Sequence, residues 1–380
     1  MKVVIAMDSF KGSLSSIDAG EAVREGIQRA CDAKVVIKPA ADGGEGTTRT
    51  LVDGLGGTYR SVTVTGPDGV PVQARYGVLP DGETIVMEMA EAAGITLIRP
   101  EERDPRHATT FGVGEMIQDA VRQGGRKFLI GIGGSATTDG GAGMLQALGC
   151  RFLDATGSAI GRGIEHLDRI ERIDISGMMS ELSQCSFQIA CDVVNPLCGE
   201  QGAVYVYGPQ KGVKEEEKPE LDAKMRHFAG ETAKYLGKDY RSMEGAGAAG
   251  GLGFAFVSYF PNVTLKSGIE IVMDAVGLEE EIRDADLVVT GEGRLDSQTG
   301  MGKLPVGIAR LAKKYGKPVI AFAGSVAEDA GVCNQAGIDA FFPIVRGITT
   351  LEEAMKKEQA GKNLSLSVEQ VFRLIQTVSI

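Results

Sequence analysis

The stretch VVIAMDSFKGS, residues 3–13, decides the fold, because five apolar residues run directly into a loop of acidic, hydroxyl and glycine residues. Apolar residues then recur at helical spacing from Ala19 to Ala30, and residues 34–38 form a second apolar run. Asp18 and Glu21 offer a capping box at the start of that helix. A strand, a helix and a second strand in this order predict a βαβ unit with parallel strands.

The same alternation returns near the other end of the chain. A helix is predicted to begin at Pro305, since proline is favoured in the first turn. Another is expected near residues 327–336. The apolar runs that these helices separate are residues 287–290, 319–323 and 341–345. This part therefore reads as a second series of parallel strands and helices.

The middle of the chain has a different pattern. Residues 58–88 alternate in short stretches separated by turn signals, which is typical of antiparallel strands. We therefore predict an α/β fold, with a Rossmann/flavodoxin-like parallel sheet lobe and a second mixed α/β lobe inserted into it. The expected domains are residues 1–57 with 283–380 and residues 58–282, with the active site in the cleft between them.

Composition excludes several classes of protein. With 43% hydrophobic and 24% charged residues, the 380-residue chain is globular. A net charge of -11 opposes binding to nucleic acid, which requires clustered Lys and Arg. No apolar run approaches the roughly 20 residues that cross a bilayer, and the first one reaches Asp8 too early for a signal peptide. We expect a cytoplasmic protein with no nucleic-acid or membrane partner; its oligomeric state is open, with a homodimer as one candidate.

Six cysteines without a C-x-x-C pair favour reduced thiols over zinc ligands or disulfides. The three histidines are far apart in the sequence and are expected to be structural; they are His107, His166 and His227.

Several predicted strands end in loops of small, acidic and hydroxyl residues. These are VVIAM-DSFKGS, VVIKPA-ADGGEGT, FLIGI-GGSATTDGGAG, FQIA-CDVVNP and LVVT-GEGRLDSQTGMGK. In parallel α/β folds, ligands bind beyond the carboxyl ends of the strands. The loops are therefore expected to meet at a binding site.

One of these loops enters a helix predicted at residues 140–148, where backbone N–H groups and the helix dipole favour phosphate. Its phosphate-binding candidates are Gly133, Gly134, Ser135 and Thr137. The alternative is a tight turn capped by Thr or Asp. No G-x-x-x-x-G-K-[ST] motif is present, which disfavours a P-loop NTPase.

A second glycine-rich segment, residues 245–253, is predicted to be a loop. Gly245, Gly247 and Gly250 fit G-x-G-x-x-G, but polar residues and not a strand precede them. A flexible loop over phosphates, or a hinge, is favoured over a dinucleotide site.

Phosphoryl transfer needs a metal held by carboxylates, cations on the phosphates and a carboxylate that orients or deprotonates the hydroxyl. The loops supply all three. The carboxylate candidates are Asp42, Glu45, Asp139, Asp192, Glu292 and Asp296, and the cations are Lys11, Arg294 and Lys303. For each carboxylate, a turn or helix cap is the commoner role.

Five segments together resemble the type I glycerate kinases of bacteria. They are AMDSFKGSLSS, PAADGGEGT, GIGGSATTDGGAGML, ACDVVNPLCG and TGEGRLDSQTGMGKLP, in the family's order. The resemblance implies two α/β domains and transfer of the ATP γ-phosphate to D-glycerate with Mg²⁺. It favours the 2-hydroxyl as acceptor and leaves the 3-hydroxyl open.

On this resemblance we assign roles to residues of the five segments. Asp192 is the first candidate for the base, with Asp42 and Asp296 as rivals. Glu292 or Asp296 would hold magnesium. The remaining assignments are Lys11 as a catalytic cation, Arg294, Ser9 and Ser13 on glycerate, and Lys303 with Gly133, Gly134, Ser135 and Thr137 on the ATP phosphates.

Two other classes of function stay open at this point. A nicotinamide-dependent oxidoreductase would account for the α/β pattern and the G-x-G-x-x-G match. A sugar-acid sensor without catalysis would account for a cleft, but the sequence shows no basic helix or tail for a DNA partner.

Overall fold

The computed structural model describes residues 1–44 and 46–378. Contacts divide the chain into two compact units, which are described separately here. The first unit contains Met1–Leu55 and Ile269–Ile380, and the second contains Gly56–Gly268. The second unit is thus inserted, in sequence, into the first.

The first unit is built on a five-stranded sheet in which all neighbouring strands are parallel. Its strands, in spatial order, are β13 (Ala340–Pro343), β12 (Val319–Val326), β11 (Leu287–Leu295), β1 (Lys2–Met7) and β2 (Lys34–Ile37). Numbered within this unit, the order is that of a flavodoxin-like sheet, with its topological switch point between β1 and β11. The predicted fold class is confirmed.

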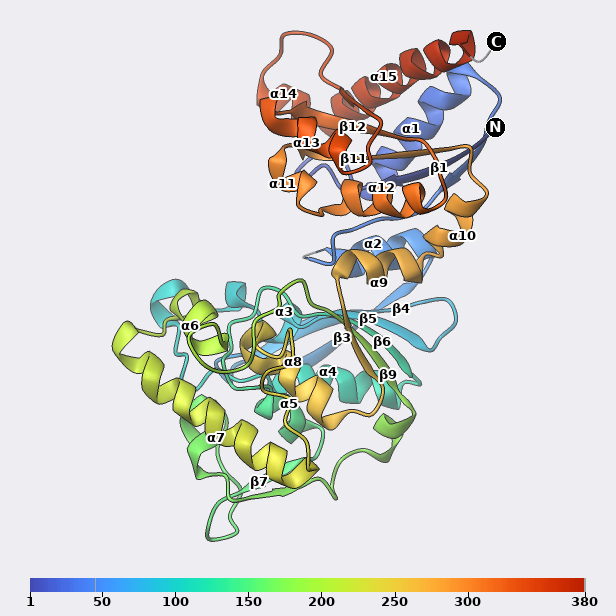
Figure 1. Cartoon of the computed structure of the whole chain (residues 1–380). Helices are drawn as coiled ribbons and strands as arrows, with labels where there is room; N and C mark the ends of the chain where they lie inside the picture. The colour runs from blue at the N-terminus through green and yellow to red at the C-terminus, as the bar shows by residue number, and fades with distance from the viewer. Residues whose placement is uncertain (45, 379–380) are drawn as a thin grey trace. The chain divides into compact units, whose positions relative to one another are not determined.

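Helices cover both faces of this sheet (Figure 1). They are α1 (Ser16–Ala30), α2 (Thr47–Leu55), α9 (Gly268–Ala275), α10 (Leu278–Arg283), α11 (Ser297–Gly300), α12 (Leu304–Lys314), α13 (Val332–Gln335), α14 (Leu351–Met355) and α15 (Lys357–Val378). Val3 and Ile5 of β1 are fully buried in one cluster with apolar residues of α1 and α15, while α12 packs on β11 and β12. Period-two alternation along β1 explains how one strand serves both layers.

The cap of α1 differs from the prediction. Ser15, and not Asp18, is the N-cap, and its Oγ accepts a hydrogen bond from the Asp18 N–H at 3.1 Å. Asp18 is therefore the third helical residue, where its carboxylate accepts the Ser15 hydroxyl at 2.8 Å. The helix begins at Ser16, one turn earlier than the apolar spacing from Ala19 indicated, because Ile17 alone in its first turn does not extend that spacing.

The second unit contains a mixed six-stranded sheet and a two-stranded one, β7 (Arg151–Leu153) with β8 (Arg172–Asp174). The larger sheet has the order β10 (Val263–Lys266), β9 (Ser186–Ala190), β6 (Lys127–Gly131), β5 (Thr84–Glu88), β4 (Pro71–Val78) and β3 (Thr58–Thr65). The pairs β3–β4 and β4–β5 are antiparallel, and the others are parallel. The antiparallel prediction for residues 58–88 is confirmed.

The helices of this unit surround a single large apolar cluster. They are α3 (Ala90–Ala93), α4 (Phe111–Arg122), α5 (Ala142–Ala147), α6 (Ala203–Tyr207), α7 (Lys218–Leu236) and α8 (Ala248–Tyr259). Among all described helices of the chain, none has the length and apolar character that crossing a membrane requires.

Two glycine-rich segments depart from the prediction. β11 extends to Leu295, five residues beyond the predicted end, because Gly291 lets the strand lie close to β12; a Cβ there would lie 1.9 Å from the Phe322 carbonyl oxygen. Residues 248–259 form α8, interrupted at Ala249, Gly250 and Gly251, which have φ of 52°, 69° and 96°. This segment is largely buried, so it is neither a flexible loop nor a hinge.

Candidate active site

A pocket of about 600 Å³ lies at the carboxyl edge of the first unit's sheet. The loops after β1, β2 and β13 and the carboxyl-terminal parts of β11 and β12 line it, together with residues of α14 and α15. This is the position at which open parallel sheets bind ligands. The pocket is formed entirely by residues of the first unit.

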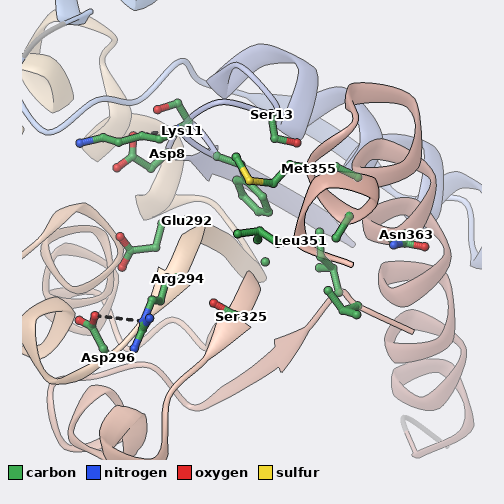
Figure 2. Close-up of a pocket in the computed structure, with 18 of the residues that line it drawn as sticks. Asp8, Lys11, Ser13, Glu292, Arg294, Asp296, Ser325, Leu351, Met355 and Asn363 are labelled. Atoms are coloured by element: carbon green, nitrogen blue, oxygen red, sulfur yellow. Dashed lines mark hydrogen bonds and ion pairs between the residues drawn. The ribbon is translucent and has the colours of Figure 1, made fainter. Parts of the chain in front are cut away.

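The pocket has a charged end at the switch point. Its carboxylates are Asp8, Asp42, Glu292 and Asp296, and its cations are Lys11, Arg294 and Lys303. Figure 2 shows Asp8, Lys11, Glu292, Arg294 and Asp296 together on one side of the pocket. The predicted residues Ser9 and Ser13 line it as well.

Asp8 is the most strongly perturbed group of this end. Burial raises its pKa from 3.8 to about 7, and the negative charges of Asp42 and Glu292 act in the same direction. A hydrogen bond from the Ser9 N–H at 2.7 Å and the charge of Lys11 oppose the shift. Asp8 therefore titrates close to neutral pH, which is where a general base works most effectively.

Glu292 and Arg294 lie on the extension of β11 that sequence analysis took for a loop. The Glu292 side chain is 8% exposed and accepts a hydrogen bond from the Thr299 hydroxyl at 2.6 Å. Burial raises its pKa, and the charges of Asp296 and Asp42 add to that effect. Since residues two apart project from the same face of a strand, β11 presents a carboxylate and a guanidinium side by side.

Asp296 has a structural role in this arrangement. Its Oδ1 accepts the N–H groups of Gln298 at 3.0 Å and Thr299 at 3.3 Å, so it caps α11. Its Oδ2 lies 3.6 Å from Nε of Arg294, whose side chain is 67% exposed. The alternative role considered for Asp296, a helix cap, is therefore present in the structure.

The charged end fits magnesium in the manner usual for phosphoryl transfer. Within residues 1–44 and 46–378, no three His, Cys, Asp or Glu side chains are placed to hold a metal ion by themselves. Magnesium at such sites usually has one or two carboxylate ligands and completes its shell with phosphates and water. Asp8, Asp42 and Glu292 line the same end of the pocket, and their negative charges raise the pKa of Asp8 and of Glu292, an effect that a bound cation would offset.

The other candidates lie at the carboxyl edge of the second unit's sheet. Gly133 and Gly134, which follow β6, are exposed, whereas Ser135 and Thr137 are buried. Lys211, which is 1% exposed, donates from Nζ to Ser135 Oγ at 2.7 Å and to the Thr137 carbonyl oxygen at 2.5 Å. Only the two glycines of this loop thus offer backbone to a ligand.

Asp139 occupies the helix N-terminus that the sequence suggested for phosphate. It is fully buried, and its carboxylate accepts N–H groups of Thr110 at 2.8 Å, Gly141 at 3.1 Å and Gly143 at 3.2 Å. The helix α5 begins at Ala142 and is only six residues long. The N–H groups at this N-terminus are therefore already bonded to the Asp139 carboxyl group, which is the capping role weighed against a metal-binding one.

Asp192 follows β9 and is exposed. Its Oδ1 accepts the N–H of Gly268, the first residue of α9, at 3.1 Å. This contact supports the capping role that was weighed against a catalytic one. Glu45 lies outside the described residues.

The G-x-G-x-x-G segment serves packing. The carbonyl oxygen of Gly250 accepts the Gly140 N–H at 3.0 Å, and a Cβ on Gly250 would lie 2.0 Å from the Thr137 carbonyl oxygen. The glycine permits close approach of two loops and packs against the Thr137 backbone. The main reason for considering an oxidoreductase is thereby removed.

All six cysteines, which lie in the described part of the chain, are free thiols, and three of them are buried. His227 Nε2 lies 2.8 Å from the Ile170 carbonyl oxygen, and His107 pairs with Asp104 at 2.7 Å. These contacts agree with structural roles.

Sequence analysis overlooked two residues. Asp8 immediately follows β1, a strand at the topological switch point, and the rule about strand ends could have identified it. Lys211 ends a short 3-10 helix (Pro209–Lys211) that carries no motif, so no sequence signal indicated its burial.

The fold and the charged pocket define an α/β protein suited to phosphorylated ligands. A family model described as "Glycerate kinase family" matches residues 3–376. The chain is 48% identical over 375 residues to "Glycerate kinase" of Bacillus subtilis, covering 97% of this chain and 98% of that protein. It is also 48% identical to "Glycerate 2-kinase" of Escherichia coli, covering 94% and 93% of the two chains.

A crystal structure from Salmonella typhimurium LT2, provisionally described as glycerate kinase 2, matches with a TM-score of 0.91 at 44% identity. The match covers 100% of this chain and 99% of that one. The chain belongs to the glycerate kinase family.

Proposed function

We propose that this protein transfers the γ-phosphoryl group of ATP to D-glycerate, with 2-phosphoglycerate as the favoured product. The observation that carries the proposal is the charged end of the first unit's pocket, where carboxylates and cations meet at the switch point of a flavodoxin-like sheet. Membership in the glycerate kinase family and the name of the Escherichia coli relative support the choice of substrate and of hydroxyl.

In the reaction, the glycerate hydroxyl oxygen bonds to the γ-phosphorus of ATP, and the bond from that phosphorus to the oxygen of ADP breaks. Asp8 is our first candidate to accept the hydroxyl proton, because its pKa of about 7 matches neutral pH. Asp42 and Asp192 remain candidates for the same role.

The cations of the pocket divide the remaining work. Lys11 and Lys303 would neutralise phosphate oxygens, and Arg294 would hold the glycerate carboxylate, since its planar fork can bind both oxygens. Ser9 and Ser13 are proposed as further hydrogen-bond partners of glycerate. In the second unit, the exposed backbone of Gly133 and Gly134 stays a candidate for phosphate.

Glu292 and Asp42 are the proposed magnesium ligands, and Asp296 is a weaker one because its Oδ1 already accepts two N–H groups. Magnesium supplies positive charge that neutralises the transferring phosphoryl group. The carboxylates of this chain would position that charge over the phosphates.

Proton-coupled phosphorus NMR of the product from D-glycerate and ATP tests the proposal. Phosphate on the 2-hydroxyl is attached to a carbon with one hydrogen and gives a doublet. A triplet would move the phosphate to the 3-hydroxyl, whose carbon has two hydrogens. Absence of any new phosphate ester would contradict the proposed activity.

A further inference from the structure

The end of the first unit's pocket opposite the charged residues is apolar. Phe10 and Ile344, which are 4% and 3% exposed, contribute to its buried part. Leu351, Ala354 and Met355 of α14 line it from another side. Figure 2 shows Leu351 and Met355 on the side away from Arg294 and Asp296. One pocket therefore joins an apolar compartment to an anion-binding one.

Apolar side chains are also unusually exposed around this end. In residues 345–355, Val345 is 38% exposed, Ile348 fully exposed, Leu351 77% and Met355 36%. Single exposed apolar residues are common, but a group of them marks an interaction surface, and beside a pocket such a surface is suited to a ligand. Three of the four, Val345, Leu351 and Met355, line the pocket itself.

Asn363 of α15 adds one polar group to the apolar end. Its side chain is only 8% exposed, and its Oδ1 accepts a hydrogen bond from Gln359 Nε2 at 3.0 Å. In the described part of the chain, Gln359 is the one hydrogen-bond partner of this side chain. The carboxamide NH₂ is thus available to an acceptor on a ligand.

We infer that this apolar end is the subsite for the base of ATP, with the triphosphate extending to Lys11 and Lys303. The inference rests on the proposed function for the identity of the nucleotide. A purine has apolar faces, which Leu and Met side chains can cover, and a polar edge, which a carboxamide can bind. A pocket of about 600 Å³ is also within the usual range for ligands much larger than glycerate.

The second unit is a less suitable place for the base of ATP than the apolar end of the first unit's pocket. The helix N-terminus beside its glycine-rich loop already holds the Asp139 carboxyl group, which accepts the N–H groups of Gly141 and Gly143. The base is therefore assigned to the first unit.

The test compares ATP with inorganic tripolyphosphate, which has the phosphates but no base, by titration calorimetry with Mg²⁺. Leu351→Ser is the variant, and Leu374→Ser is the matched control, since Leu374 is a 60% exposed leucine of α15 outside the pocket. Because both leucines are exposed, neither change should disturb folding. We expect Leu351→Ser to weaken ATP binding about tenfold and to leave tripolyphosphate binding unchanged, with no effect of Leu374→Ser.

Unchanged ATP affinity in Leu351→Ser would overturn the inference, and so would an equal loss for ATP and tripolyphosphate. The proposed function is judged separately, by turnover of D-glycerate in the wild type. If D-glycerate is turned over but Leu351→Ser binds ATP as tightly as the wild type, the proposed function stands and the base subsite is wrong. If Leu351→Ser weakens ATP binding but the wild type does not turn over D-glycerate, the base subsite stands and the proposed function is wrong.

Discussion

Asp8→Asn should make the ligand-free protein more stable at pH 8 while removing most of its turnover. The pKa of Asp8 is raised by burial from 3.8 to about 7. At 1.36 kcal/mol per pKa unit, keeping this carboxylate ionised costs at most about 4 kcal/mol of folding free energy. Water reaches the half-buried side chain and screens part of this cost, so we expect a gain of about 1 to 2 kcal/mol in the variant.

Asparagine has the same shape, and its Oδ1 can still accept the Ser9 N–H that Asp8 accepts at 2.7 Å. The gain corresponds to a rise in Tm of about 3 to 6 °C for a domain of this size. Turnover should fall by about 100-fold or more, because asparagine cannot accept the hydroxyl proton.

The pH dependence fixes the sign of the effect. The folded state holds a proton on Asp8 between pH 3.8 and 7 that the unfolded state has released. Wild-type stability therefore falls as pH rises through this window, and the full cost is present above pH 7. The advantage of Asp8→Asn should be largest at pH 8 and should shrink as pH is lowered to 5.

Scanning calorimetry in EDTA, without nucleotide, measures this at pH 5 to 8. Asp18→Asn is the control. Burial acts to raise the pKa of Asp18, but hydrogen bonds from Lys357 and Ser15 outweigh it, so this pKa is lowered overall. Its stabilising effect is lost only at pH below 3.8, so Asp18→Asn should be slightly destabilising to the same extent throughout. An Asp8→Asn variant that is less stable than wild type, or whose advantage is equal at pH 5 and 8, would refute the reasoning.

Three further substitutions test other parts of the proposed site. Arg294→Lys should raise the KM for glycerate more than the KM for ATP, because the charge remains while the two-pronged geometry is lost; a rise for ATP alone would assign Arg294 to the phosphates. In Asp192→Asn the new side chain can still accept the Gly268 N–H, so turnover close to wild type would show that Asp192 is a cap. A loss of turnover of about 100-fold would show that Asp192 is the base. Rescue of that loss by added magnesium would show instead that Asp192 is a metal ligand. Burial lowers the pKa of Lys211 to about 7, so this lysine is mostly uncharged at pH 8. Lys211→Met at pH 8 should lower the free energy of unfolding by about 1 to 3 kcal/mol in urea titrations, because Ser135 loses a buried hydrogen-bond donor. An unchanged urea midpoint would contradict this.

The sequence predicted the fold class because its strongest signals are local. The apolar runs of β1 and β12 and the helical spacing of α1 reflect burial that any parallel sheet requires. The strand extension at Glu292 and Arg294 was missed because glycine is depleted in strands. Gly291 is explained by the closeness of β12, which is a contact between distant parts of the chain.

Site residues were harder to predict because spacing cannot separate a ligand from a cap. Asp139 and Asp8 both follow strands, yet one is saturated by N–H groups and the other accepts a single one from Ser9. Lys211 acquires its role only through tertiary burial. Burial and hydrogen-bond partners, which the sequence does not display, decide which acidic residue retains free acceptors.

A coupled assay of ADP release tests the central claim most directly. Purified protein with Mg-ATP is assayed with D-glycerate, with glycerol in its place, and with D-glycerate after excess EDTA. We predict ADP release that saturates with D-glycerate, is absent with glycerol, which lacks the carboxylate for Arg294, and stops when magnesium is removed. ADP release that is independent of glycerate, or that proceeds equally with glycerol, would contradict the account.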